Sequence, residues 1–111
     1  TVIAVHVFEP LALLGHLPPP VDFAVAEQHA FELLRDTWCA PLTKAGVTFD
    51  VRVVEGVPGP AIVALAAESQ ANQIVLGSRG RSSVADLVLG STSSYVLHHA
   101  EVPVTIVSTR A

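Results

Sequence analysis

The residues whose types and spacing could do chemistry lie in one stretch of this 111-residue chain. Gly77-Ser78-Arg79-Gly80 is followed, after nine residues, by Gly90-Ser91-Thr92. Glycine lets a backbone approach a phosphate closely, and the N–H groups at the start of a helix attract an anion. Hydroxyls and a guanidinium group can add hydrogen bonds to phosphate oxygens. The stretch therefore contains the parts of a phosphate cradle.

A plainer interpretation of the same stretch stays open. The glycines can be turn residues, and Ser91 can be an ordinary helix N-cap. The sequence holds no GxxxxGK[ST] motif, its single lysine, Lys44, lies far upstream, and no GxGxxG follows a strand. Without a lysine at the phosphates, fast hydrolysis of the P-loop type is not expected.

Catalytic and metal-binding alternatives have less support in the sequence. A GxSxG nucleophile motif is absent, and Ser78, Asp86 and His98 form a triad only on paper. The single cysteine, Cys39, is interpreted as a packed small hydrophobe. Five histidines occur without HExxH spacing, so surface or core roles are expected for them and no metal site is predicted: His6, His16, His29, His98 and His99.

Composition limits the class of protein. Half of the residues are hydrophobic and 14% are charged, which is typical of a folded domain, and the length suits one domain over residues 1–111. The net charge of −4, with six scattered basic residues, does not suit nucleic acid. No apolar run reaches membrane-spanning length and no export signal starts the chain, so a cytoplasmic protein without membrane contact is expected.

The elements that must position the cradle follow from hydrophobic patterning. A β-branched run predicts a buried parallel strand over Val2–Phe8, and prolines predict a long loop over Glu9–Pro20. Helical spacing then predicts a helix from Val21 to about Ala45 that Gly46 ends. Pro41 should kink or shorten this helix near Thr37.

The second half of the chain continues the alternation of strand and helix. Alternation of this kind predicts a parallel sheet with right-handed crossovers. The expected elements are a strand over Val47–Val54, a turn over Gly56–Pro60, helices over Pro60–Gln70 and Ser91–Ala100, and strands over Ile74–Gly77 and Val102–Val107.

The segment Gly77-x2-Gly80-x9-Gly90-Ser91 resembles the nucleotide-binding signature of the universal stress protein family. Ile74-Val-Leu-Gly-Ser-Arg-Gly, Tyr95-Val-Leu-His-His-Ala, Val102-Pro-Val-Thr-Ile-Val and Glu55-Gly-x-Pro58 also match that family in order and spacing. The resemblance covers nearly the whole chain. It implies an α/β fold with a flavodoxin-like or Rossmann-like parallel sheet and helices on both faces, of the adenine nucleotide alpha hydrolase type.

The resemblance also implies which residues bind. Family members that bind ATP hold ribose and phosphates with residues that correspond here to Gly77, Gly80, Gly90, Ser91 and Thr92, with Arg79 as a further candidate. A backbone contact with adenine falls on Val7. The implied protein is a stress-response regulator that binds ATP, with Mg²⁺ as an accompanying ion, and hydrolyses it slowly at most. The alternative is a dimeric interaction module of the same fold that binds no nucleotide.

Two further expectations come from the resemblance. Members pair through their last strand, so Val102–Val107 is expected to form the edge of a homodimer, and an apolar edge strand needs such cover. The chain starts at what would be the second strand of the family, so the fold is expected to be truncated at its N-terminus by one strand–helix unit. Either the chain is a fragment, or another chain supplies that strand.

Overall fold

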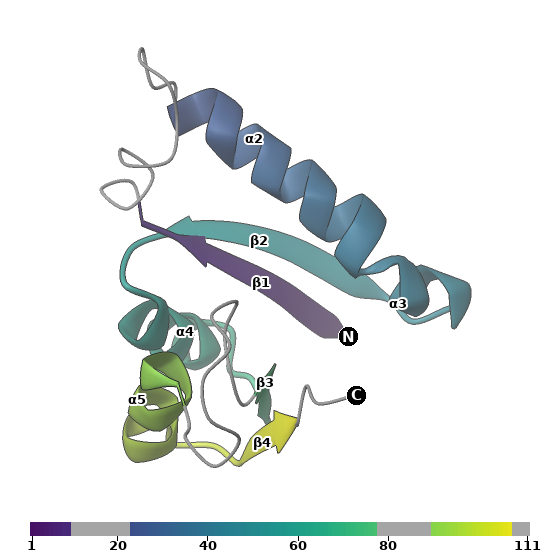
Figure 1. Ribbon diagram of the computed structural model, residues 1–111. Helices are drawn as coiled ribbons and strands as arrows, with labels where there is room; N and C mark the ends of the chain where they lie inside the picture. The colour runs from purple at the N-terminus through teal and green to yellow at the C-terminus, as the bar shows by residue number, and fades with distance from the viewer. Residues whose placement is uncertain (10–22, 78–89, 108–111) are drawn as a thin grey trace. The chain divides into compact units, whose positions relative to one another are not determined.

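Strands and helices alternate through the computed structural model, which describes residues 1–9, 23–77 and 90–107. The chain divides into two compact units, Thr1–Val57 and Pro58–Ala111 (Figure 1). In chain order the elements are β1 (Val2–Phe8), α2 (Phe23–Leu33), the π-helical segment η1 (Leu34–Trp38), α3 (Ala40–Lys44), β2 (Phe49–Glu55), α4 (Pro58–Glu68), β3 (Ile74–Gly77), α5 (Ser91–His99) and β4 (Val104–Val107).

The first unit is built on a parallel pair of strands. β1 and β2 pair in register from Val2 with Phe49 to Phe8 with Glu55. Two parallel strands that are neighbours need a long connection, and here the helical run supplies it. Figure 1 shows α2 lying along the strand pair. Phe8, Leu34 and Cys39 are the buried hydrophobic residues among those described in this unit. The predicted strand over residues 2–8 is confirmed.

The helical run between β1 and β2 is not one kinked α-helix. The Cys39 N–H bonds to the Leu34 carbonyl at 2.9 Å, five residues back, so the turn holds one extra residue. Pro41, which has no N–H, then stands in the first turn of the separate helix α3. The break lies where the proline predicts it, but its form is a π turn followed by a new helix. Gly46, at φ +72°, ends α3 as predicted.

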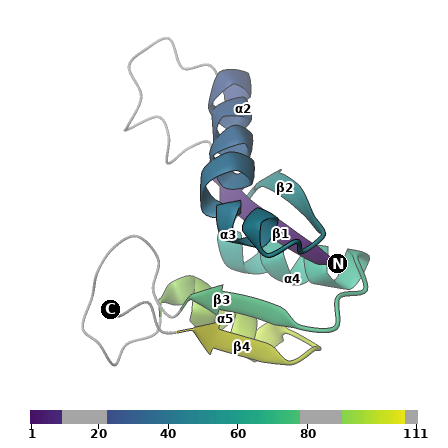
Figure 2. The same ribbon diagram turned by 90° about the vertical axis from the view of Figure 1, so that its right-hand side faces the viewer.

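The second unit repeats the parallel pairing. β3 and β4 pair in register from Ile74 with Val104 to Gly77 with Val107 (Figure 2), and α4 packs against α5. Val96 on α5 is fully buried and Ile74 on β3 is 8% exposed. Gly59 allows α4 to approach α5 closely, since a Cβ there would lie 2.8 Å from the ring of Tyr95.

Four predicted boundaries are wrong by two residues, and backbone chemistry explains each one. The second strand begins at Phe49 because the Val47 N–H bonds to the Leu42 carbonyl and belongs to the end of the helix. The next helix begins at Pro58, since proline suits a first turn, and it ends before Gln70, whose φ is +54°. The last strand begins at Val104 because Pro103 has no N–H for a ladder.

Some of the segments interpreted from the sequence lie outside the residues that the structure describes. Nearly all of the predicted loop at residues 9–20 lies outside the described residues. Within the described ranges, no helix has both the length and the apolar character that crossing a membrane requires.

Candidate functional site

The carboxyl end of β3 meets the first turn of α5. The Ser93 hydroxyl, on α5, donates a hydrogen bond of 2.9 Å to the carbonyl of Gly77, the last residue of β3. Gly77 is exposed, and Gly90 is half-buried at the start of the helix. Two parts of the glycine signature that lie far apart in sequence are therefore adjacent in space, at the end of a parallel strand where α/β proteins bind ligands.

The first turn of α5 carries backbone N–H groups that make no intrahelical hydrogen bond. Gly90 occupies the N-cap position with extended backbone (φ −66°, ψ 163°), and its carbonyl accepts from the Ser94 N–H at 3.0 Å. The N–H groups of the three residues between them precede the first intrahelical bond, and the helix dipole makes this end positive. The interpretation of Ser91 as an ordinary N-cap is wrong, because the cap is a glycine without a side chain. The arrangement suits a negatively charged group.

The three hydroxyl residues of this first turn differ in exposure. Ser91 is exposed and Thr92 is half-buried, so both can reach a ligand. Ser93 is 4% exposed and its hydroxyl is bonded to Gly77. Sequence reasoning missed Ser93, because a serine in the first turn of a helix does not indicate a tertiary partner.

The remaining predicted site residues are not brought together by the described structure. Arg79 and Gly80 lie outside the described residues, as do Ser78 and Asp86 of the paper triad. Val7 is half-buried near the end of β1, opposite Val54, and belongs to the first unit.

The histidines at the end of α5 bond to their own helix. Nδ1 of His98 lies 2.7 Å from the Ser94 carbonyl, and Nδ1 of His99 lies 2.8 Å from the Tyr95 carbonyl. The His99 ring also stacks on Tyr95, with centroids 3.9 Å apart. Across residues 1–9, 23–77 and 90–107, no three His, Cys, Asp or Glu side chains are grouped to hold a metal ion.

In the first unit, a thiol, an imidazole and an ion pair have surroundings that can be described residue by residue. Cys39 is buried, and desolvation raises the pKa of its thiol, so the neutral thiol is favoured. The ring of His6 on β1 meets that of Trp38 edge-on, with centroids 5.7 Å apart. Hydrogen bonds from Arg35 at 2.7 and 2.8 Å lower the pKa of the Asp36 carboxyl, and both side chains are exposed.

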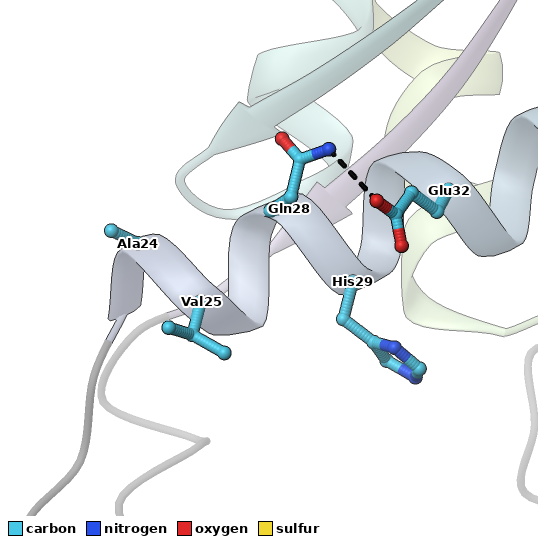
Figure 3. Close-up of a pocket in the computed structure, with 5 residues that line it drawn as sticks. All are labelled: Ala24, Val25, Gln28, His29 and Glu32. Carbon is cyan, nitrogen blue, oxygen red and sulfur yellow. Dashed lines mark hydrogen bonds between the residues drawn. The ribbon is translucent and has the colours of Figure 1, made fainter.

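A pocket on the exposed side of α2 contains none of the predicted site residues. Figure 3 shows its lining side chains projecting from one helix, with Gln28 Nε2 donating to Glu32 Oε1 at 3.1 Å. The lining residues are Ala24, Val25, Gln28, His29 and Glu32. Among the residues that the structure describes, α2 alone lines this pocket, so it carries no part of the predicted site.

The comparisons with known proteins all identify the same family. The model of the universal stress protein family matches residues 1–108. A universal stress protein of Thermus aquaticus is 32% identical over 106 residues, which is 95% of this chain and 75% of the relative. One from Synechocystis is 44% identical over 62 residues, 56% of this chain. That match spans 40% of the Synechocystis protein, and a second Synechocystis relative is matched over 50% of its length.

Solved structures share the fold. A protein described as hypothetical protein PH0823 has a TM-score of 0.79 at 25% identity, over 98% of this chain and 76% of that one. A universal stress protein in complex with cAMP has a TM-score of 0.62 at 28% identity, over 97% and 73% of the two chains. An Arabidopsis thaliana family protein with AMP bound has a TM-score of 0.63 at 24% identity, over 98% and 63%. The predicted α/β parallel-sheet fold is confirmed.

Proposed function

Because this chain belongs to the universal stress protein family, we propose that it binds an adenine nucleotide, with ATP as the first ligand to test. Solved proteins of similar fold hold cAMP and AMP. The observation that carries the proposal to this chain is the bond from the Ser93 hydroxyl to the Gly77 carbonyl, which joins the end of β3 to the start of α5. A strand end beside a helix N-terminus is a favourable place for phosphate.

Each residue of the signature has a proposed role. Gly77, Gly80 and Gly90 let the backbone approach the ribose and phosphates, because they carry no Cβ. The N–H groups and hydroxyls of Ser91 and Thr92 donate to phosphate oxygens, and their exposure permits it. The remaining proposed contacts are the guanidinium of Arg79, which would pair with a phosphate, and the backbone of Val7, which would contact adenine.

The nucleotide would act as a signal in this proposal. The chain would be a cytoplasmic stress-response regulator whose state depends on bound ATP, with Mg²⁺ held mainly by the phosphates. In proteins Mg²⁺ is commonly bound through substrate phosphates and a few carboxylates. Hydrolysis would be slow, because the only lysine of the chain, Lys44, lies on α3 in the other unit.

Calorimetric titration of nucleotide-free protein with ATP and Mg²⁺ tests the proposal. The variant Gly80→Val, Ser91→Ala should bind at least about tenfold more weakly, because it obstructs the loop and removes one donor. Ser94→Ala is the matched control on the same helix and should bind as the wild type does. Equal binding by the double variant would place the nucleotide elsewhere, and no binding by the wild type would favour the interaction module that lacks a ligand.

We also propose that two copies of the chain pair through β4. In the described part of the second unit, β4 has β3 as its one strand neighbour, and Val107 is 49% exposed. Such an edge favours pairing with another strand. Sedimentation velocity should show a dimer that Val107→Lys weakens and that Val75→Lys, at an exposed position of β3, leaves intact. A monomeric wild type at all concentrations would refute the pairing.

A further inference from the structure

We infer that Ser93 is a positioning residue that fixes the two halves of the phosphate site relative to each other, an inference that rests on the proposed function. One half is the end of β3 at Gly77, and the other is the first turn of α5. The Ser93 hydroxyl joins them through its 2.9 Å bond to the Gly77 carbonyl.

The surroundings of Ser93 distinguish it from the two hydroxyl residues before it. Its side chain is 4% exposed, whereas Ser91 is exposed and Thr92 is half-buried. Among the residues that the structure describes, every buried side-chain nitrogen or oxygen has a hydrogen-bond partner. Because a buried hydroxyl loses free energy without a partner, the Ser93 hydroxyl stays with Gly77 and does not turn to a ligand. Its effect on a nucleotide is therefore indirect.

The two halves are otherwise held by different contacts. β3 is fixed by its ladder with β4, in which Gly77 pairs with Val107. α5 is fixed by packing, with Val96 fully buried at its centre. A phosphate that receives hydrogen bonds from both halves needs their donors at one set of distances, and small displacements weaken such binding strongly. The bond between Ser93 and Gly77 restrains this distance at the site itself.

A matched pair of variants isolates the hydroxyl. Ser93→Thr keeps the oxygen, and Ser93→Val replaces it with a methyl group of nearly the same size. We expect the threonine variant to bind ATP as the wild type does and the valine variant to bind about fivefold to tenfold more weakly. Ser93→Ala should match the valine variant, and it adds no volume that could disturb folding. Ser94→Ala is the neutral neighbour.

Two further readouts separate positioning from general destabilisation. Adenosine has no phosphate, so equilibrium dialysis should give the same adenosine affinity for all variants. The carbonyl ¹³C resonance of Gly77 should shift in Ser93→Val and Ser93→Ala and stay in place in Ser93→Thr, since a hydrogen bond changes the shielding of its acceptor. This resonance is measured without nucleotide, so it reports the bond whether or not ATP binds.

The outcomes distinguish the two proposals. Equal ATP affinity of the threonine and valine variants overturns the role of Ser93 and leaves the proposed function standing. An equal loss of ATP and adenosine affinity also overturns it, because the effect is then not specific to phosphate. A wild type that binds neither ligand refutes the proposed function, and the inference falls with it even if the Gly77 resonance confirms the bond.

Discussion

At Gly59 there is no room for even one added side-chain atom, the Cβ. A Cβ at this position would lie 2.8 to 2.9 Å from Cβ, Cγ and Cδ1 of Tyr95. These atoms belong to the base of the side chain, so a rotation of the ring alone cannot relieve the clash. The close approach of α4 and α5 therefore depends on the absence of a side chain.

Gly59→Ala should lower the free energy of unfolding by about 1–3 kcal/mol, the usual cost of added volume in a packed interface. Urea denaturation measures the change. Combining it with Tyr95→Ala, which removes Cγ and Cδ1, should recover part of the loss, because the two positions share one space and their effects should not be additive. Additive effects of the two substitutions would contradict the contact.

The Cys39 thiol should react slowly while the chain is folded. The residue is 4% exposed, and burial raises the pKa of the thiol, so less thiolate is present at neutral pH than in an exposed cysteine. Labelling with iodoacetamide at pH 7 should be slow in buffer, should rise to the rate of a model thiol in denaturant, and should increase with pH. Fast labelling of the folded chain would mean that the thiol is accessible.

The end of α3 shows how one residue type ends an element. Gly46 has φ +72°, a left-handed backbone conformation that a side chain disfavours. Apart from its chain neighbours, no atom of the described residues lies within 4 Å of a Cβ built there. Gly46→Ala should therefore cost about 1–2 kcal/mol from the backbone alone. Gly46→Asn should cost less, since asparagine tolerates this region better. Thermal unfolding of the two variants measures the difference in stability. Equal losses would contradict the role given to the left-handed backbone conformation.

Local patterns predict an element well when its limits are set by its own sequence. The strand over residues 2–8 follows from its β-branched run, and β3 ends at Gly77 as expected. The predicted limits near Pro58 and Pro103 are wrong because the two prolines have different effects. A proline without an N–H is tolerated in the first turn of a helix, but it cannot donate a hydrogen bond in a strand ladder. The bond from Ser93 to Gly77 could not be predicted, since it needs α5 to lie beside β3. Arg79, Gly80 and Val7 remain predictions as ligands.

At the scale of the whole molecule, the prediction of a single domain can be tested with two built-in probes. In the part of the chain that the structure describes, each unit holds a two-stranded sheet, which is marginal as an independent structure. Trp38, the only tryptophan, belongs to the first unit, and Tyr95, the only tyrosine, belongs to the second.

Unfolding in urea should therefore give one transition for both units. Tryptophan fluorescence excited at long wavelength follows Trp38, and tyrosine absorbance in the second derivative follows Tyr95. Coincident midpoints are expected for one cooperative domain. Midpoints that differ between the probes would show that the units unfold separately and would refute the single-domain prediction.

The parallel registers also decide how early the sheets can form. Val2 pairs with Phe49, and Ile74 pairs with Val104, so neither strand pair can close as a local hairpin. Pairings between residues so distant in sequence give a high contact order, and chains of high contact order fold slowly. During synthesis the apolar strand β1 leaves the ribosome before β2 and cannot form its ladder with β2 until that strand follows. A chaperone that binds β1 would therefore protect this chain from aggregation mainly while residues 9–48 are being made.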